Sequence, residues 1–199
     1  MSNYKPKLLK FADYNDPVLH QKTEPVKFPL SEEDKNIIAD MIYSIQPDQL
    51  KRANAAWEVP AGMAANQWGI AKSIFLFCPY GNTSSLKVII NPSYEHMPTL
   101  AIIAAPESCE WEGCFSVPLA TGNIKRSHKI KIKYQDQTGK VIEDVMSGYN
   151  ARVWQHETDH LNGHLYDDPR TGRCIEKKTF NNLREVDEFY EDLRNKRKK

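Results

Sequence analysis

The sequence lacks any long uninterrupted run of apolar residues. No stretch approaches the roughly 18 apolar residues that a membrane-spanning helix needs, and residues 1–10 contain no apolar core followed by a small-residue cleavage site. Charge of one sign is lacking as well, because 27 Lys and Arg oppose 26 Asp and Glu and leave a formal net charge of +1. We therefore expect a cytoplasmic protein that has neither a membrane nor a sequence-specific nucleic acid as its partner.

Cysteine, glycine and proline are also scarce. The four cysteines form no C-x-x-C pair, which disfavours a structural zinc knuckle, and a cytosolic chain of this size does not need disulfides. The 9 Gly and 12 Pro among 199 residues are too few for a fibrous or low-complexity chain. Because 40% of the residues are hydrophobic and no linker divides the chain, we expect a single domain over residues 1–199.

Hydrophobic periodicity predicts an α+β protein with helices near both ends and strands between them. Ser31, followed three residues later by Asp34, is typical of a helix N-cap, and apolar residues then recur at helical spacing as far as Ile45. Strands are expected over residues 72–79, 86–92, 129–134 and 141–145, and further helices over about 148–163 and 175–195.

The most informative segment runs from His156 to His160 and has the pattern H-E-x-x-H. Two histidines four residues apart lie on one face of a helix about one turn apart, which is the separation needed to bind one metal ion. Glu157 leaves the same turn and can act as a general base and then as a general acid. The structural alternative is a chance match, with both histidines buried on an inward stripe that also holds Tyr149 and Val153.

Two histidines do not complete a metal site, and the third ligand separates the candidate classes of enzyme. Tyr166 occupies the position where a metzincin has its third histidine, and His164 follows the glycine at which the helix should end. Glu176 or Glu185 could serve as the downstream ligand of a gluzincin-type metallo-endopeptidase. The remaining candidate is an upstream cysteine, Cys114. Residue chemistry alone leaves these alternatives open.

Three separate blocks resemble the peptide deformylase family, in the family's own order. Residues 62–69 (GMAANQWG) resemble its G-x-G-L-A-A-x-Q block, and residues 112–116 (EGCFS) resemble its E-G-C-L-S block. Residues 155–163 (QHETDHLNG) match Q-H-E-x-D-H-L-x-G in full. The resemblance covers about residues 8–167 and is followed by a C-terminal helix and basic tail over about 175–199. It implies antiparallel or mixed sheets packed around a central metal-binding helix.

The resemblance implies an enzyme that hydrolyses the N-formyl group from N-formyl-methionyl nascent polypeptides and releases formate. The metal would be Fe²⁺, although Zn²⁺, Ni²⁺ or Co²⁺ can occupy such a site, and Glu157 would carry the proton. Gln67 and the backbone N–H of Phe115 would bind the developing oxyanion. The implied metal ligands are Cys114, His156 and His160.

The resemblance also implies roles around the substrate and beneath the metal helix. Gly62 would let the substrate backbone approach closely, and Tyr149 with Val153 would line the pocket for the methionine side chain. Asp159 would form a buried ion pair with Arg126, which would orient the residues around the metal ligands.

The sequence departs from the family pattern at a few positions. Pro60 replaces the first glycine of the first block, and Met63, Phe115 and Arg152 stand where other residues are usual. These positions touch the substrate pockets, so the expected reaction is unchanged.

The alternatives to this function are an HExxH metallo-endopeptidase and a non-catalytic deformylase-like binding protein that has kept the fold.

The end of the chain is strongly basic. Residues 194–199 hold five positive charges and follow an acidic stretch over 185–192. Acidic residues before basic ones complement the dipole of a helix, so the structural reading is a well-capped helix with a solvated end. The functional alternative is a ribosome contact, in which the basic tail touches ribosomal RNA near the nascent chain.

Overall fold

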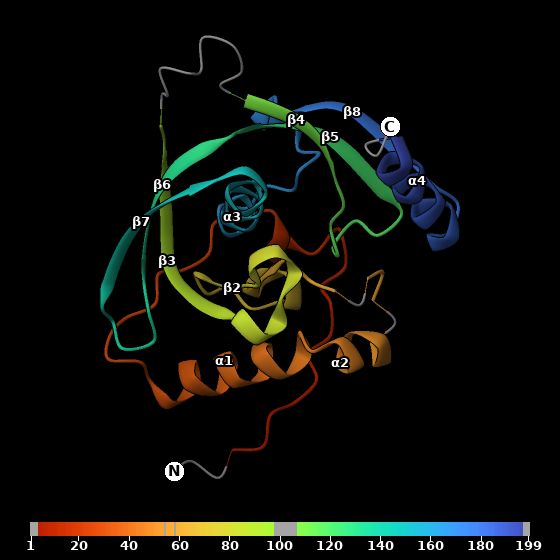
Figure 1. Cartoon of the computed structure of the whole chain (residues 1–199). Coiled ribbons are helices and arrows are strands. Elements are labelled where there is room, and N and C mark those ends of the chain that lie inside the picture. Colours follow the sequence, from red (N-terminus) through yellow and green to blue (C-terminus); the bar gives the residue numbers. More distant parts are fainter. Residues whose placement is uncertain (1–3, 54, 58, 98–106, 197–199) are drawn as a thin grey trace.

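The structure, a computed structural model, describes residues 4–53, 55–57, 59–97 and 107–196. It is an α+β fold in which a central helix lies between two antiparallel sheets (Figure 1). The helices are α1 (Glu32–Ser44), α2 (Pro47–Arg52), α3 (Gly148–Leu161) and α4 (Leu183–Lys196), with 3-10 turns η1 (Pro17–Leu19), η2 (Ala65–Trp68), η3 (Pro79–Gly81), η4 (Thr83–Ser85) and η6 (Pro169–Thr171). The strands are β1 (Gly62–Ala64), β2 (Ile74–Phe77), β3 (Lys87–His96), β4 (Glu107–Glu112), β5 (Ala120–Ser127), β6 (Lys129–Gln135), β7 (Val141–Ser147) and β8 (Cys174–Thr179).

Helix α1 begins where the sequence predicts. Ser31 Oγ accepts the backbone N–H of Asp34 at 3.0 Å, and the Asp34 carboxylate accepts the backbone N–H of Ser31 at 3.2 Å. This reciprocal cap satisfies two N–H groups that would otherwise lack partners. Ile38 and Met41 are then buried in the core that α1 shares with the larger sheet.

The larger sheet has five strands in the order β1-β2-β3-β6-β7. The alternation predicted for residues 129–134 is confirmed, because Ile130, Ile132 and Tyr134 of β6 are buried while Lys131 and Lys133 are exposed. The predicted partner over 141–145 is confirmed as β7, which pairs antiparallel with β6. One face of this sheet therefore packs on the core, and the lysine row faces water.

The smaller sheet has three strands in the order β4-β5-β8, and it corrects the prediction for the C-terminal region. The expected helix over about 175–195 is wrong in its first part, since Cys174–Thr179 forms β8 and the helix begins only at Leu183. Strand β8 pairs antiparallel with β5, with Ala120 opposite Thr179. Most of β8 is exposed, so no local apolar pattern marks it as a strand. Its extended conformation depends instead on main-chain hydrogen bonds to a strand that is distant in the sequence.

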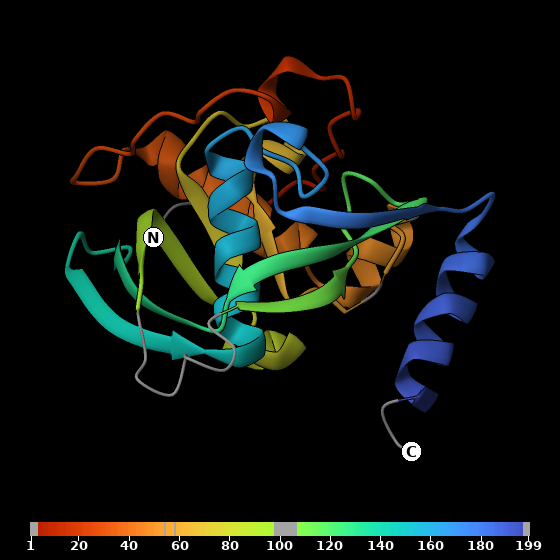
Figure 2. The same cartoon turned by 90° about the horizontal axis from the view of Figure 1, so that it is seen from above.

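Helix α3 lies between the two sheets and has a different neighbour on each side (Figures 1 and 2). Trp154 is fully buried against the five-stranded sheet, where its ring meets Phe75 edge-on at 5.0 Å. A separate cluster beneath the three-stranded sheet contains Cys114, Ile124 and Tyr166. The aromatic packing therefore fixes the rotation of α3, and the histidines face the smaller sheet.

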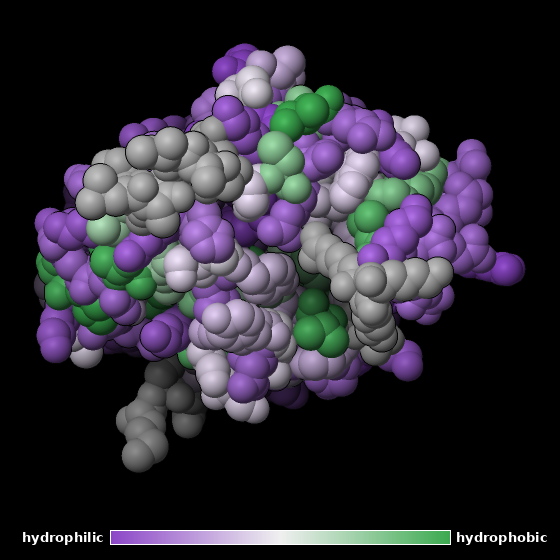
Figure 3. Space-filling model, turned by 45° about the horizontal axis from the view of Figure 1, so that its top comes forward, coloured by the Kyte–Doolittle hydropathy of each residue, from purple (hydrophilic) through white to green (hydrophobic). Residues whose placement is uncertain are grey.

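The outer surface is mixed in character. On the face that Figure 3 shows, apolar residues form separate small groups among hydrophilic ones. None of the helices in the described part of the chain is long and apolar enough to cross a membrane.

Candidate active site

Helix α3 brings the two histidines of the H-E-x-x-H segment together. His156 and His160 lie one turn apart, and their Nε2 atoms are 3.2 Å from each other. His160 is 1% exposed. Two imidazole nitrogens that converge in a buried place repel each other unless a proton or a cation lies between them.

The third side chain of the cluster comes from the chain just after β4. Cys114 is buried, and its Sγ lies 3.2 Å from His160 Nε2. One ligand atom each from Cys114, His156 and His160 lies within 4.8 Å of the others. One thiolate and two imidazoles form a donor set that suits a divalent transition metal and leaves a fourth position open. The residues therefore fit a catalytic metal ion.

The acidic residues that an endopeptidase would use lie elsewhere. Glu176 is exposed on β8, where its carboxylate is 3.9 Å from Lys178 Nζ. Glu185 caps the start of α4 by accepting the backbone N–H of Asn181 at 3.0 Å. Among the described residues, only Cys114 joins the two histidines in a potential metal group. The structure therefore offers no support for a gluzincin-type site.

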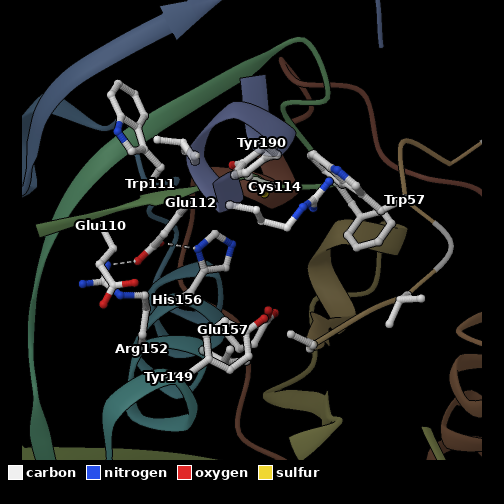
Figure 4. Close-up of a pocket in the computed structure, with 18 of the residues that line it drawn as sticks. Trp57, Glu110, Trp111, Glu112, Cys114, Tyr149, Arg152, His156, Glu157 and Tyr190 are labelled. Atoms are coloured by element: carbon white, nitrogen blue, oxygen red, sulfur yellow. Dashed lines mark hydrogen bonds and ion pairs between the residues drawn. The ribbon is translucent and has the colours of Figure 1, made fainter. Parts of the chain in front are cut away.

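Glu112, the last residue of β4, orients one of the histidines. His156 Nδ1 donates to Glu112 Oε2 at 2.9 Å, which leaves the lone pair on Nε2 directed at the cluster (Figure 4). Arg126 donates to both oxygens of the same carboxylate, at 2.7 and 3.0 Å, and Arg152 donates to Oε1. Burial alone would raise the pKa of Glu112, but Arg126 and His156 hold that pKa well below its usual range.

Glu112 was not predicted to have a role of its own, although it stands two positions before Cys114. The predicted ion pair between Arg126 and Asp159 is confirmed, with Arg126 Nη1 donating to Asp159 Oδ2 at 2.7 Å. Arg152, expected only as a departure from the family pattern, donates to Glu112 and to the carbonyl of Ser108. The two arginines compensate a carboxylate that could not otherwise remain charged in the interior.

Glu157 is 4% exposed, and its side chain lies close to Gly62 of β1. A Cβ on Gly62 would be 2.7 Å from Glu157 Cγ and 2.8 Å from its Oε1. Gly62 was expected to admit the substrate backbone; its close neighbour in the structure is the Glu157 side chain, which only glycine leaves room for. Burial raises the pKa of Glu157 to about 7, and a divalent cation nearby would lower it again.

Gln67 and Phe115 both lie near Cys114 and line the same cavity. Gln67 Oε1 accepts the backbone N–H of Ala64 at 2.9 Å, while its Nε2 points toward Cys114 Sγ at 3.6 Å and donates to Ser116 Oγ at 3.2 Å. The Phe115 ring packs edge-on against Trp57 at 5.3 Å. The amide of Gln67 is thus held with its donor end toward the cluster.

These residues open into one cavity of about 400 Å³. Cys114, His156, Glu157 and Val153 line it together with Tyr149. The expectation that Tyr149 lies on the inward stripe of the helix is wrong, because its side chain is 49% exposed and stacks on Tyr80. Tyr149 is in the first turn of α3, beyond the part of the helix that the sheets cover.

Comparison with known proteins gives consistent matches. The family model for polypeptide deformylase matches residues 8–174. The peptide deformylase of Latilactobacillus sakei is 37% identical over 161 residues, which cover 77% of this chain and 84% of that protein. That of Thermotoga maritima is 38% identical over 153 residues, which cover 76% and 80%.

Solved structures agree with these matches. The crystal structure of the Thermotoga maritima peptide deformylase is similar with a TM-score of 0.65 and 33% identity, covering 85% of this chain and 99% of that one. Arabidopsis thaliana peptide deformylase 1B, in complex with an inhibitor, is similar with a TM-score of 0.67 and 26% identity, covering 80% of each chain. The family match contains all the cluster residues and ends before α4.

Proposed function

The chain belongs to the peptide deformylase family of metal-dependent hydrolases, and from this premise we propose how its own residues remove the formyl group from N-formyl-methionyl nascent chains. The overall reaction adds water across the formyl amide and yields formate and a free amino terminus. The observation that carries the proposal is the buried convergence of Cys114, His156 and His160 in a cavity that Glu157 also lines.

Cys114, His156 and His160 would hold the metal ion. When bound, the ion supplies Lewis-acid activation of the attacking water and of the formyl carbonyl. We propose Fe²⁺ as the physiological ion on the strength of the family resemblance, since a thiolate with two imidazoles accepts Zn²⁺, Ni²⁺ or Co²⁺ as well. Glu112 keeps the His156 ring in the tautomer that leaves Nε2 unprotonated.

Glu157 moves the proton. Its carboxylate takes a proton from the attacking water as the new C–O bond forms, and it delivers that proton to the amine nitrogen as the C–N bond breaks. Burial raises the pKa of the Glu157 carboxyl, which helps the side chain to hold the proton between these two steps. Gly62 supports the role by leaving the space that the Glu157 side chain occupies.

Gln67 and Phe115 stabilise the charge that develops on the formyl oxygen. Gln67 Nε2 lies 3.6 Å from Cys114 Sγ, the backbone N–H of Phe115 belongs to the residue after Cys114, and both residues line the cavity. Donors that are already oriented before the reaction lower the barrier without rearrangement. Tyr149 and Val153 line the cavity beside them, and we propose that they contact the methionine side chain.

The direct test is release of formate from formyl-Met-Ala-Ser by protein loaded with Fe²⁺ under anaerobic conditions. The wild-type protein is expected to turn over, and Cys114→Ala is expected to lose both its metal and its activity. Cys109→Ala, which changes an exposed cysteine of β4, is the matched control and is expected to behave like the wild type. No wild-type turnover would favour a non-catalytic binding protein, and an active Cys114→Ala protein would favour a different third ligand.

We also propose a ribosome contact for the basic tail and, because nascent chains are the substrate, a cytoplasmic location. Residues 194–199 hold five positive charges, and residues 197–199 of this tail lie outside the part of the chain that the structure describes. Arg194 also lines the cavity, so the test leaves it in place and removes only the residues after it. Lys and Arg bind phosphates in a salt-dependent, sequence-independent way. Removing residues 195–199 is expected to weaken binding to ribosomes at low salt; unchanged affinity would contradict the contact.

A further inference from the structure

The C-terminal helix α4 forms one wall of the metal cavity, although it lies beyond the matched family range. Four of its residues line the same cavity as Cys114 and Glu157. They recur at spacings of three, three and one, which places them along one side of the helix over two turns. These residues are Asp187, Tyr190, Leu193 and Arg194.

Aromatic and apolar contacts hold α4 in this position at the end of β8 (Figure 2). Val186 is 1% exposed, and the ring of Phe189 meets Trp111 of β4 edge-on at 5.0 Å. Lys178 Nζ, from β8, lies 5.3 Å from the centre of the Trp111 ring and 5.0 Å from that of Phe189. The helix is therefore docked through one face, and its neighbouring face is directed at the cavity.

Tyr190 adds a hydrogen bond to this docking. Thr121 Oγ1 already donates its proton to the carbonyl of Glu112 at 2.7 Å, so the contact of 2.6 Å between Tyr190 Oη and Thr121 Oγ1 requires Tyr190 to be the donor. Burial raises the pKa of Tyr190 to about 12, and the hydroxyl therefore keeps the proton that it donates. This bond ties α4 to β5 directly beside the cluster.

Tyr190 and Trp57 approach the backbone just before Cys114. A Cβ on Gly113 would lie 2.8 Å from the Trp57 ring and 3.1 Å from Tyr190 Oη. Figure 4 shows Tyr190 beside Cys114 and Trp57 across the cavity from Glu112. Trp57 and Tyr190 thus narrow the cavity next to Cys114, and Leu193 and Arg194 line it about one turn further along α4.

At Leu193 and Arg194 the wall combines an apolar side chain with a cationic one. Leu193 is half-buried, and Arg194 beside it is exposed. Asp187 lies two turns earlier, roughly 10 Å away along the helix axis, so its charge is separated from that of Arg194. A peptide whose formyl end reaches the cluster can extend along this wall, because the wall lines the same cavity.

We propose that α4 binds the residues that follow formyl-methionine, with Leu193 contacting an apolar side chain and Arg194 attracting a carboxylate. This inference rests on the proposed deformylase function and extends it to substrate selection. It makes α4 a specificity-determining element that acts on binding of the longer peptide rather than on the formyl group itself.

The test compares two substrates that share the reacting group, N-formyl-methioninamide and formyl-Met-Leu-Glu. Leu193→Ala is expected to lower kcat/KM for the tripeptide about fivefold, the factor for losing about half the burial of a leucine. Arg194→Gln is expected to lower it about two- to fivefold, the range for an exposed charge pair. Both variants should leave kcat/KM for the amide unchanged.

The ratio of the two kcat/KM values is the decisive readout, since it does not depend on how much protein is folded or loaded with metal. Arg184→Gln is the matched control, because Arg184 is exposed on the same helix and pairs with Glu188 away from the cavity. A ratio that stays at the wild-type value in Leu193→Ala and Arg194→Gln would overturn the inference while the deformylase function stands. A wild-type protein that is inactive on both substrates would overturn the deformylase function, and this inference with it.

Discussion

The substitution Glu112→Gln tests whether the buried carboxylate organises the metal site. Glutamine keeps the shape of the side chain but removes the negative charge that lies between Arg126 and Arg152. It also removes the charged acceptor of the His156 Nδ1–H at 2.9 Å. Two buried guanidinium groups are left with less compensation, and His156 loses the group that sets its tautomer.

The magnitude follows from the burial of the network. Removing one partner of a buried ion pair costs about 3–5 kcal/mol, which for a chain of this length corresponds to a fall in Tm of roughly 6–20 °C. Loss of a group that orients a metal ligand lowers metal affinity by about 10- to 100-fold. Both effects are expected in one variant because Glu112 contacts the arginines and the histidine together.

The assay is urea unfolding of the metal-free protein, followed by a metal competition titration of the folded variant. Glu143→Gln is the matched control, since Glu143 also bridges two cations, Lys131 and Lys133, each at 3.0 Å, but on the exposed face of the larger sheet. That control is expected to lose about 1 kcal/mol or less. Equal losses of stability in the two variants, with unchanged metal affinity in Glu112→Gln, would refute the reasoning.

Three further predictions concern the reaction itself. Glu157→Gln is expected to keep its metal but lose about 10²- to 10⁴-fold in kcat, the usual contribution of general acid–base catalysis; a variant that retains a few tenths of the wild-type turnover would show that another group carries the proton. Gly62→Ala would place a Cβ 2.7 Å from Glu157 Cγ, so kcat should fall by about 10²-fold through displacement of the carboxylate, while metal content by elemental analysis stays at the wild-type level. Activity of the iron form should decay in air faster than that of a nickel-substituted form, because the Cys114 thiolate and ferrous iron are both oxidisable; equal half-lives in aerated buffer would count against iron as the sensitive component.

Local chemistry explains which elements were predictable. The Ser31–Asp34 cap depends on residues three positions apart, and the alternation of 129–134 depends on the period of a strand. The inward face shared by His156 and His160 depends on the period of a helix in the same way. Each of these features was predictable because it depends on residues that are only a few positions apart in the sequence.

Features made by distant segments were predicted poorly or were missed. Strand β8 exists because its backbone pairs with β5, more than 40 residues earlier, and no local apolar pattern distinguishes it from a helix. The exposure of Tyr149 depends on how much of α3 the sheets cover. Helical periodicity cannot predict that coverage, because it shows only which residues share a face of the helix. The carboxylate of Glu112 has its role only because Arg126 of β5 and Arg152 and His156 of α3 contact it in the folded protein.

The sequence by itself determined the chemistry available to this protein: a thiol, two imidazoles one helical turn apart, a carboxylate between them, and motifs that identify the family. The tertiary structure alone decided which way these side chains face and which segments form the walls of the cavity around them. Burial of the larger sheet against Trp154 turns the histidines toward Cys114, and the docking of Phe189 on Trp111 brings α4 to the cavity. Side-chain identity is a property of each residue, whereas burial, ion-pair partners and cavity walls arise only when segments far apart in the chain pack together.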